Sequence, residues 1–212
     1  MDRKDWAQLV YKTLAPLYPH PKPELHFANS FQLLVATVLS AQCTDERVNQ
    51  VTPVLFEQFP DPQAMARAER SELERIIYST GFYHAKARSI QDLSKAILSQ
   101  YNGQVPDTME ALTSLRGVGR KTAGVILSAC YSVPALIVDT HVSRICFRLG
   151  FTGDRNPSKT ESMLAQLYHQ DQWITIGHCL NQHGRRVCTS RRPDCIGCPL
   201  SLHCPKTGVR IS

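Results

Sequence analysis

The sequence predicts an all-α fold, because apolar residues recur at helical spacing along almost the whole chain and no two segments show strand-like alternation. Glycines and prolines separate the periodic segments. The chain has 212 residues, 42% of them hydrophobic, enough to bury the core of one domain or of two small lobes. Residues 133–138 could form a strand, but they have no plausible partner.

Helices are expected in succession along the chain. The first covers residues 5–18, and the second, 31–41, is apolar on most faces and should lie buried at the centre. A third begins at Thr44 and Asp45. The others are expected at 72–79, 85–101, 108–115, 120–131, 140–149, 158–168 and 173–184, with Pro60-Asp61-Pro62 among the breaks.

The composition argues against a membrane or secreted protein. No stretch reaches the roughly 18 uninterrupted apolar residues of a membrane helix. The N-terminal residues lack the apolar core of a secretory signal. We therefore expect a cytoplasmic or nucleoid-associated protein.

The net charge of +6 is concentrated in two segments. Residues 111–150 carry five basic residues and one acid, Asp139, while residues 178–212 carry six basic residues and one acid, Asp194. The rest of the chain is net negative. This distribution suits a face that binds a polyanion, although charge alone would fit an ordinary basic surface equally well.

Four of the eight cysteines fall close together near the C-terminus, in the pattern C-x6-C-x2-C-x5-C: Cys188, Cys195, Cys198 and Cys204. Four thiolates suit tetrahedral zinc or a [4Fe–4S] cluster. A single CxxC with two longer arms favours the cluster, because a zinc ribbon usually has two such knuckles, but the spacing does not exclude zinc. A closed set of four ligands favours a structural role. The other four cysteines are expected as free thiols in apolar surroundings: Cys43, Cys130, Cys146 and Cys179.

Residues 112–124 predict a helix, a Gly-x-Gly turn and a second helix that starts near Arg120. Gly117 and Gly119 let the backbone approach a ligand, and the amides that start the second helix would face an anion. A helix C-cap could explain Gly117 alone, and a dinucleotide fold is disfavoured because no strand precedes the glycines. The pattern indicates a helix–hairpin–helix that grips a DNA phosphate without reading sequence.

Two residues could carry chemistry. Lys121 lies in the first turn of a helix, where the helix dipole, neighbouring Arg120 and partial burial could favour a neutral amine that attacks a sugar C1′. A lysine that only binds phosphate is the plainer alternative. Asp139 is a good helix N-cap, and it could also deprotonate the nucleophile or stabilise an oxocarbenium-like sugar.

Four motifs together resemble the endonuclease III family of helix–hairpin–helix DNA glycosylases, in order and in spacing from about residue 5 to Cys204. They are LSAQCTD at 39–45, LRGVGRKTA at 115–123, VDTHV at 138–142 and the four-cysteine pattern. The resemblance implies two helical lobes with a DNA cleft between them. Residues 22–133 would form a helical-barrel domain with the hairpin at 112–124, and residues 1–21 with 134–212 would form an iron–sulfur cluster domain.

The resemblance also implies an activity. The protein would be a monomer that binds damaged duplex DNA and holds a [4Fe–4S] cluster on the four clustered cysteines. It would act as a bifunctional glycosylase/AP lyase, removing oxidised pyrimidines such as thymine glycol and dihydrothymine and nicking 3′ to the abasic site by β-elimination through a Schiff base. Lys121 and Asp139 match the family's catalytic lysine and aspartate and would face each other across the cleft.

The residues expected to contact DNA include Gln42, which would fill the gap left in the duplex, and Phe82, which would act as the wedge. The full set is Gln42, Phe82, Arg116, Gly117, Val118, Gly119, Arg120, Arg191 and Arg192. Several positions depart from the family pattern: Cys43 for alanine, Phe82 for leucine, Arg116 for proline, Gly124 for asparagine and Ser143 for a hydrophobe.

Three alternatives remain at this point. One is a monofunctional mismatch thymine or adenine glycosylase, which Lys121 disfavours, as does the absence of the further C-terminal domain of the adenine enzymes. Another is a catalytically silent module that binds damaged DNA. The third is a zinc protein with a basic tail.

Overall fold

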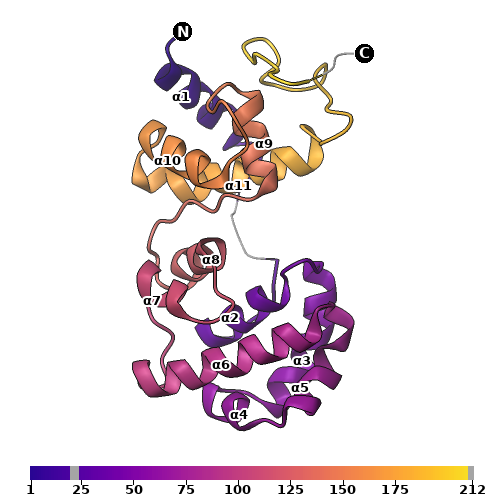
Figure 1. Cartoon of the computed structure of the whole chain (residues 1–212). Helices are drawn as coiled ribbons and strands as arrows, with labels where there is room; N and C mark the ends of the chain where they lie inside the picture. The colour runs from indigo at the N-terminus through magenta and orange to yellow at the C-terminus, as the bar shows by residue number, and fades with distance from the viewer. Residues whose placement is uncertain (20–23, 210–212) are drawn as a thin grey trace. The chain divides into compact units, whose positions relative to one another are not determined.

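The computed structural model describes residues 1–19 and 24–209, and within these ranges it contains α-helices, two short 3-10 helices and no β-strand (Figure 1). The all-α prediction is confirmed. No helix in the described ranges is both long and apolar enough to cross a membrane. The chain divides into two compact units, one formed by Met1–Pro21 with Pro134–Ser212 and the other by Lys22–Val133. The expected domain boundary at residues 21 and 22 lies outside the described residues.

The unit of residues 22–133 is built around one buried helix. Seven of the ten residues of α2 (Ser30–Leu39) are buried, as its apolar sequence predicts. The helices around it contribute most of the remaining apolar side chains of a single core. They are α3 (Asp45–Gln58), α4 (Pro62–Arg67), α5 (Arg70–Ile77), η1 (Tyr78–Thr80), α6 (Tyr83–Tyr101), α7 (Met109–Ser114) and α8 (Arg120–Cys130).

The other unit joins the N-terminal helix to the last third of the chain. Trp6 on α1 (Arg3–Leu14) is buried and donates its indole N–H to the Leu149 carbonyl at 2.9 Å, and the Tyr168 hydroxyl donates to the Ala7 carbonyl at 3.0 Å. These bonds satisfy the polar ends of rings that are otherwise part of the core. The remaining elements are α9 (Thr140–Arg148), α10 (Pro157–Leu167), η2 (Gln170–Gln172) and α11 (Trp173–Arg186).

One helix was not predicted, and one possible strand is absent. Helix α4 begins where only a break was expected, because Asp61 accepts a hydrogen bond from the Ala64 amide at 2.8 Å and Pro62 occupies the first turn. Residues 132–139 are irregular. The apolar side chains of Leu136 and Val138 pack against the core without strand pairing.

Candidate functional site

The hairpin between α7 and α8 needs glycine at one position. Gly117 has a φ of +81°, and a Cβ atom there would lie 2.8 Å from Ser89 Cβ. The Val118 amide donates to the Leu115 carbonyl at 3.1 Å and closes the turn. Gly119, with a φ of −93° and open space beside it, has no such requirement. The Val118 side chain is buried and its amide is used within the turn, so the expected contact of Val118 with DNA stays a prediction.

Helix α8 starts directly after this turn and has no side-chain cap. The amides of its first turn are therefore not satisfied by a capping side chain, and Arg120 and Lys121 are exposed on the same turn. The expected partial burial of Lys121 is wrong. Arg116 forms an ion pair with Asp92 at 3.2 Å, so part of the charge that it brings to the hairpin is already compensated.

Two loops in the same unit carry exposed residues in the left-handed backbone region. Gln42 has a φ of +54° and Phe82 a φ of +49°. Such conformations are uncommon for residues other than glycine, and they cluster at functional sites. Buried Lys86 donates from Nζ to the Thr80 carbonyl at 2.8 Å and so holds the loop that ends in Phe82.

Asp139 is the N-cap of α9, as the sequence predicts. One carboxylate oxygen accepts from the amides of His141 and Val142, both at 2.9 Å, and the other accepts from Asn181 Nδ2 at 2.7 Å. No sequence motif marks Asn181, because it lies 42 residues away and reaches Asp139 only through the packing of α11 against α9. The expected pairing of Asp139 with Lys121 involves both units and stays a prediction.

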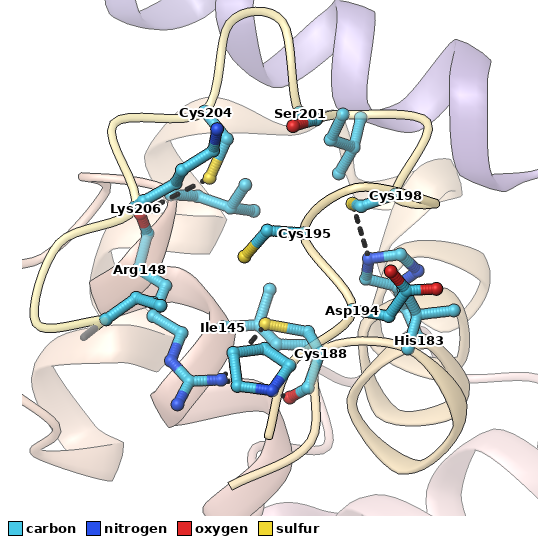
Figure 2. A pocket seen from close by; sticks show the side chains of 15 residues that line it. Ile145, Arg148, His183, Cys188, Asp194, Cys195, Cys198, Ser201, Cys204 and Lys206 are labelled. Atoms are coloured by element: carbon cyan, nitrogen blue, oxygen red, sulfur yellow. Dashed lines mark hydrogen bonds between the residues drawn. The ribbon is translucent and has the colours of Figure 1, made fainter. Parts of the chain in front are cut away.

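The four clustered cysteines line one pocket in the unit that contains α9 and α11 (Figure 2). The pocket holds about 410 Å³ of space, part of it open to solvent, and Ile145, Leu149 and Leu200 form apolar walls. No group of three or more His, Cys, Asp or Glu side chains in the described ranges is placed to hold one metal ion. The thiols thus share a pocket without converging on a single point. Burial raises the pKa of the Cys198 and Cys204 thiols.

Two buried arginines on α9 fasten the first part of the cysteine loop. Arg148 donates to Cys188 Sγ at 3.3 Å, to the Thr189 carbonyl at 2.7 Å and to the Ser190 carbonyl at 2.9 Å. Arg144 donates to the Cys188 carbonyl at 3.1 Å. Neither arginine forms an ion pair with a carboxylate in the described part of the chain. A buried guanidinium needs a compensating negative charge, and thiolates would supply it.

His183 supports the opposite side of the pocket. Burial lowers the pKa of His183 to about 4, so its ring is neutral near pH 7. Its Nδ1 lies 3.1 Å from the Tyr18 hydroxyl. Its Nε2 faces Cys198 Sγ (Figure 2), at a distance of 3.4 Å. A neutral ring that accepts from Tyr18 carries its proton on Nε2 and donates it to the sulfur. These supporting residues have no recognisable motif in the sequence.

The exposed part of the cysteine loop carries Arg191 and Arg192. The Thr189 hydroxyl donates to the Arg192 carbonyl at 2.6 Å, and the Asp194 amide donates to the Val187 carbonyl at 3.0 Å. The backbone beneath the two arginines is therefore fixed while their side chains face solvent. Of the other cysteines, Cys146 and Cys179 are buried and Cys43 and Cys130 are half-buried, and all four are free thiols.

Known proteins are similar to this chain in sequence. A family model described as HhH-GPD superfamily base excision DNA repair protein matches residues 35–170. Endonuclease III of Synechocystis sp. is 44% identical over 204 residues, covering 96% of this chain and 93% of the relative. Endonuclease III of Escherichia coli is 38% identical over 186 residues, covering 88% of each chain.

Solved structures of known proteins are also similar to this chain. A trapped endonuclease III–DNA covalent intermediate matches with a TM-score of 0.91 and 40% identity over 97% of both chains. A thermostable thymine-DNA glycosylase matches with a TM-score of 0.85 at 18% identity over 94% of this chain and 95% of the other, a likeness of fold. The helical fold with its glycine hairpin therefore defines a helix–hairpin–helix base excision repair protein. Within that class the chain belongs to the endonuclease III family, and it is a DNA glycosylase/AP lyase that acts on damaged DNA.

Proposed function

We propose that this enzyme removes oxidised pyrimidines, such as thymine glycol and dihydrothymine, with Lys121 as the nucleophile and Asp139 as its acid–base partner. The observation that carries the proposal is the exposed Lys121 in the uncapped first turn of α8, directly after the glycine hairpin. A relative that is 40% identical forms a trapped covalent intermediate with DNA, and an amine nucleophile accounts for such an adduct.

The reaction would proceed on a nucleotide turned out of the duplex. The neutral Lys121 amine attacks C1′, the bond from C1′ to the base breaks, and the base leaves with a proton. The nitrogen then loses a proton, the C1′–O4′ bond breaks and O4′ is protonated, so that the sugar ring opens and a protonated Schiff base forms at C1′. The Schiff base acidifies the C2′ position, and loss of a C2′ proton expels the 3′ oxygen and cuts the strand. Asp139, held by three hydrogen bonds, would take the proton from the amine and stabilise positive charge on the sugar.

The DNA contacts would come from three places. The amides of Gly117 and Gly119 and the exposed side chain of Arg120 would hold a phosphate, with Arg116 beside them. Gln42 and Phe82 would enter the duplex, since both are exposed on fixed backbone. Arg191 and Arg192 would contact phosphates from the cysteine loop. We expect the enzyme to act on duplex DNA in the bacterial cytoplasm as a monomer. Light scattering would test the oligomeric state by measuring its mass in solution.

Cys188, Cys195, Cys198 and Cys204 would hold a [4Fe–4S] cluster. Four soft thiols around a shared pocket, and the buried guanidinium of Arg148 that donates to Cys188 Sγ, fit an anionic cluster. A single zinc ion held by the same four sulfurs is the alternative that the cysteine spacing leaves open. When bound, the cluster would cross-link the loop that carries Arg191 and Arg192, and it would supply no step of the base-removal chemistry.

Borohydride trapping on duplexes with a single thymine glycol tests the assignment. Wild type should give a covalent adduct, Lys121→Ala should give none, and Asp139→Asn should slow base release by about 10²–10⁴-fold. Lys95→Ala, the same change at an exposed lysine of the same unit, should keep the adduct. An undiminished adduct with Lys121→Ala would exclude Lys121 as nucleophile. Base release by wild type without any adduct would indicate a monofunctional glycosylase, and binding without release would indicate a silent module.

A further inference from the structure

The two most exposed aromatic side chains in the described ranges lie in one loop. Tyr78 is 65% exposed and Phe82 is 68% exposed. They stand four positions apart, between the end of α5 and the start of α6. Large rings in water are unfavourable, and two of them in one short loop mark a contact surface rather than a random exception.

The Tyr78 ring is held in place by its neighbours. Its centroid lies 4.8 Å from that of Tyr83, and the Tyr83 ring lies 4.1 Å from that of His84. Tyr83 packs against the core of its unit, and His84 Nδ1 lies 2.8 Å from Glu74 Oε2. The three rings therefore form a row anchored in the core at Tyr83, and the side of Tyr78 away from the row is open to solvent.

The backbone that carries both exposed rings is also fixed. Gly81 and Phe82 both have positive φ angles, and the Gly81 amide donates to the Tyr78 carbonyl at 3.3 Å. Lys86 reaches back from α6 to the Thr80 carbonyl. A loop that is already ordered loses little conformational entropy when its side chains are covered by a ligand.

We propose that Tyr78 is a stacking residue for an unpaired nucleobase, the base left without a partner when the damaged nucleotide leaves the duplex. The proposal rests on the proposed role of Phe82, which would enter the duplex from the same loop. An exposed flat ring on a rigid support suits a base because every base offers a π face, and such stacking tolerates any sequence. Tyr78 would thus extend the surface through which Phe82 contacts the DNA.

The test uses the full-length protein and a duplex in which 2-aminopurine stands opposite a tetrahydrofuran abasic analogue, which the enzyme cannot cleave. Wild type and Tyr78→Phe should bind with equal affinity and quench the 2-aminopurine fluorescence. Tyr78→Leu, which keeps apolar bulk without a flat ring, should bind roughly 5- to 150-fold more weakly, the range of one stacked base, and should lose the quenching. Affinity for the undamaged duplex should not change.

Leu98→Ala serves as the control, since Leu98 is an exposed apolar residue on α6, the helix that follows the loop. It lies 15 residues beyond Tyr83 and so about 22 Å along the helix axis. Thermal unfolding should show that each variant is folded. Binding and quenching by Tyr78→Leu equal to wild type would overturn the proposal. An equal loss on damaged and undamaged duplexes would also overturn it, because the ring would then contact the duplex or support the fold.

The experiments distinguish a failure of this proposal from a failure of the proposed function. Tyr78→Leu at saturating enzyme should still form the borohydride-trapped adduct, because Tyr78 is not assigned to the chemistry. If wild type gives no adduct, the proposed function fails. If wild type gives the adduct and Tyr78→Leu binds the abasic duplex as wild type does, the stacking role of Tyr78 alone fails.

Discussion

Asp139 illustrates how one side chain can be both structural and chemical. It caps α9 through one oxygen and is oriented by Asn181 through the other. Asparagine is about as good a cap as aspartate, so Asp139→Asn keeps most of the structural role while it removes the negative charge. This explains why that variant, rather than alanine, separates the two roles in the trapping assay.

The sequence predicted the residues that stand in motifs and missed those that support them. The glycine hairpin, the Asp139 cap and the four cysteines each have a local pattern of residue types. Asn181 and Arg148 act across 40 or more positions of the sequence, and only tertiary packing brings them to their partners. The exposure of Lys121 was misjudged for a related reason, because burial is decided by neighbours distant in sequence.

Lys86 gives a pH-dependent prediction. Burial lowers the pKa of Lys86, and the nearby Cys43 thiol acts in the opposite direction. Between this lowered value and the usual lysine pKa of about 10.4, the unfolded chain binds more protons than the folded chain, so the free energy of unfolding contributed by Lys86 rises with pH. The difference in unfolding free energy between wild type and Lys86→Met should therefore increase in favour of wild type as pH rises toward that value.

Urea denaturation at about pH 7.5 and about pH 9.5 measures this difference. Both proteins should carry Cys43→Ala, so that titration of the thiol does not contribute. Parallel pH profiles for the two proteins would show that Lys86 is charged to the same extent in the folded and unfolded chain.

Among the elements, the cysteine loop depends most on contacts from outside itself. Residues 187–209 contain no helix, and the buried side chains of Arg144, Arg148 and His183 brace the loop from α9 and α11. Helices such as α2 could be predicted from their apolar pattern because that pattern is local. The path of an irregular loop follows from the contacts that brace it, which the pattern does not encode.

Removing one brace should weaken the proposed cluster. Arg148→Met deletes the donor to Cys188 Sγ and the bonds to three carbonyls, and loss of such a supporting group typically lowers metal affinity about 10–100-fold. Iron content and the visible absorbance of the cluster should fall faster under a chelator than in wild type. Arg155→Met, the same change at an exposed arginine of the same unit, is the control. Identical rates of iron loss for the two variants would show that Arg148 does not support the cluster.

At the scale of the whole molecule, DNA binding explains the uneven distribution of charge along the chain. The net charge of +6 is carried by the segments that contain the hairpin and the cysteine loop. Charge alone left an ordinary basic surface as an equal explanation. Membership of a DNA repair family, and the exposed arginines fixed on both segments, favour the DNA-binding explanation.

Salt dependence tests that explanation. Each phosphate contact releases condensed counterions, so the logarithm of the binding constant falls with the logarithm of salt concentration by about 0.9 per contact. The double variant Arg191→Ala/Arg192→Ala should flatten this slope by up to about 1.8 and leave the ratio of affinities for damaged and undamaged duplex unchanged. A second double variant, Arg155→Ala/Lys159→Ala, makes the same change in net charge at exposed positions of the same unit. If both variants shift the slope equally, only net charge matters, whereas a shift confined to the cysteine-loop variant places phosphates against Arg191 and Arg192.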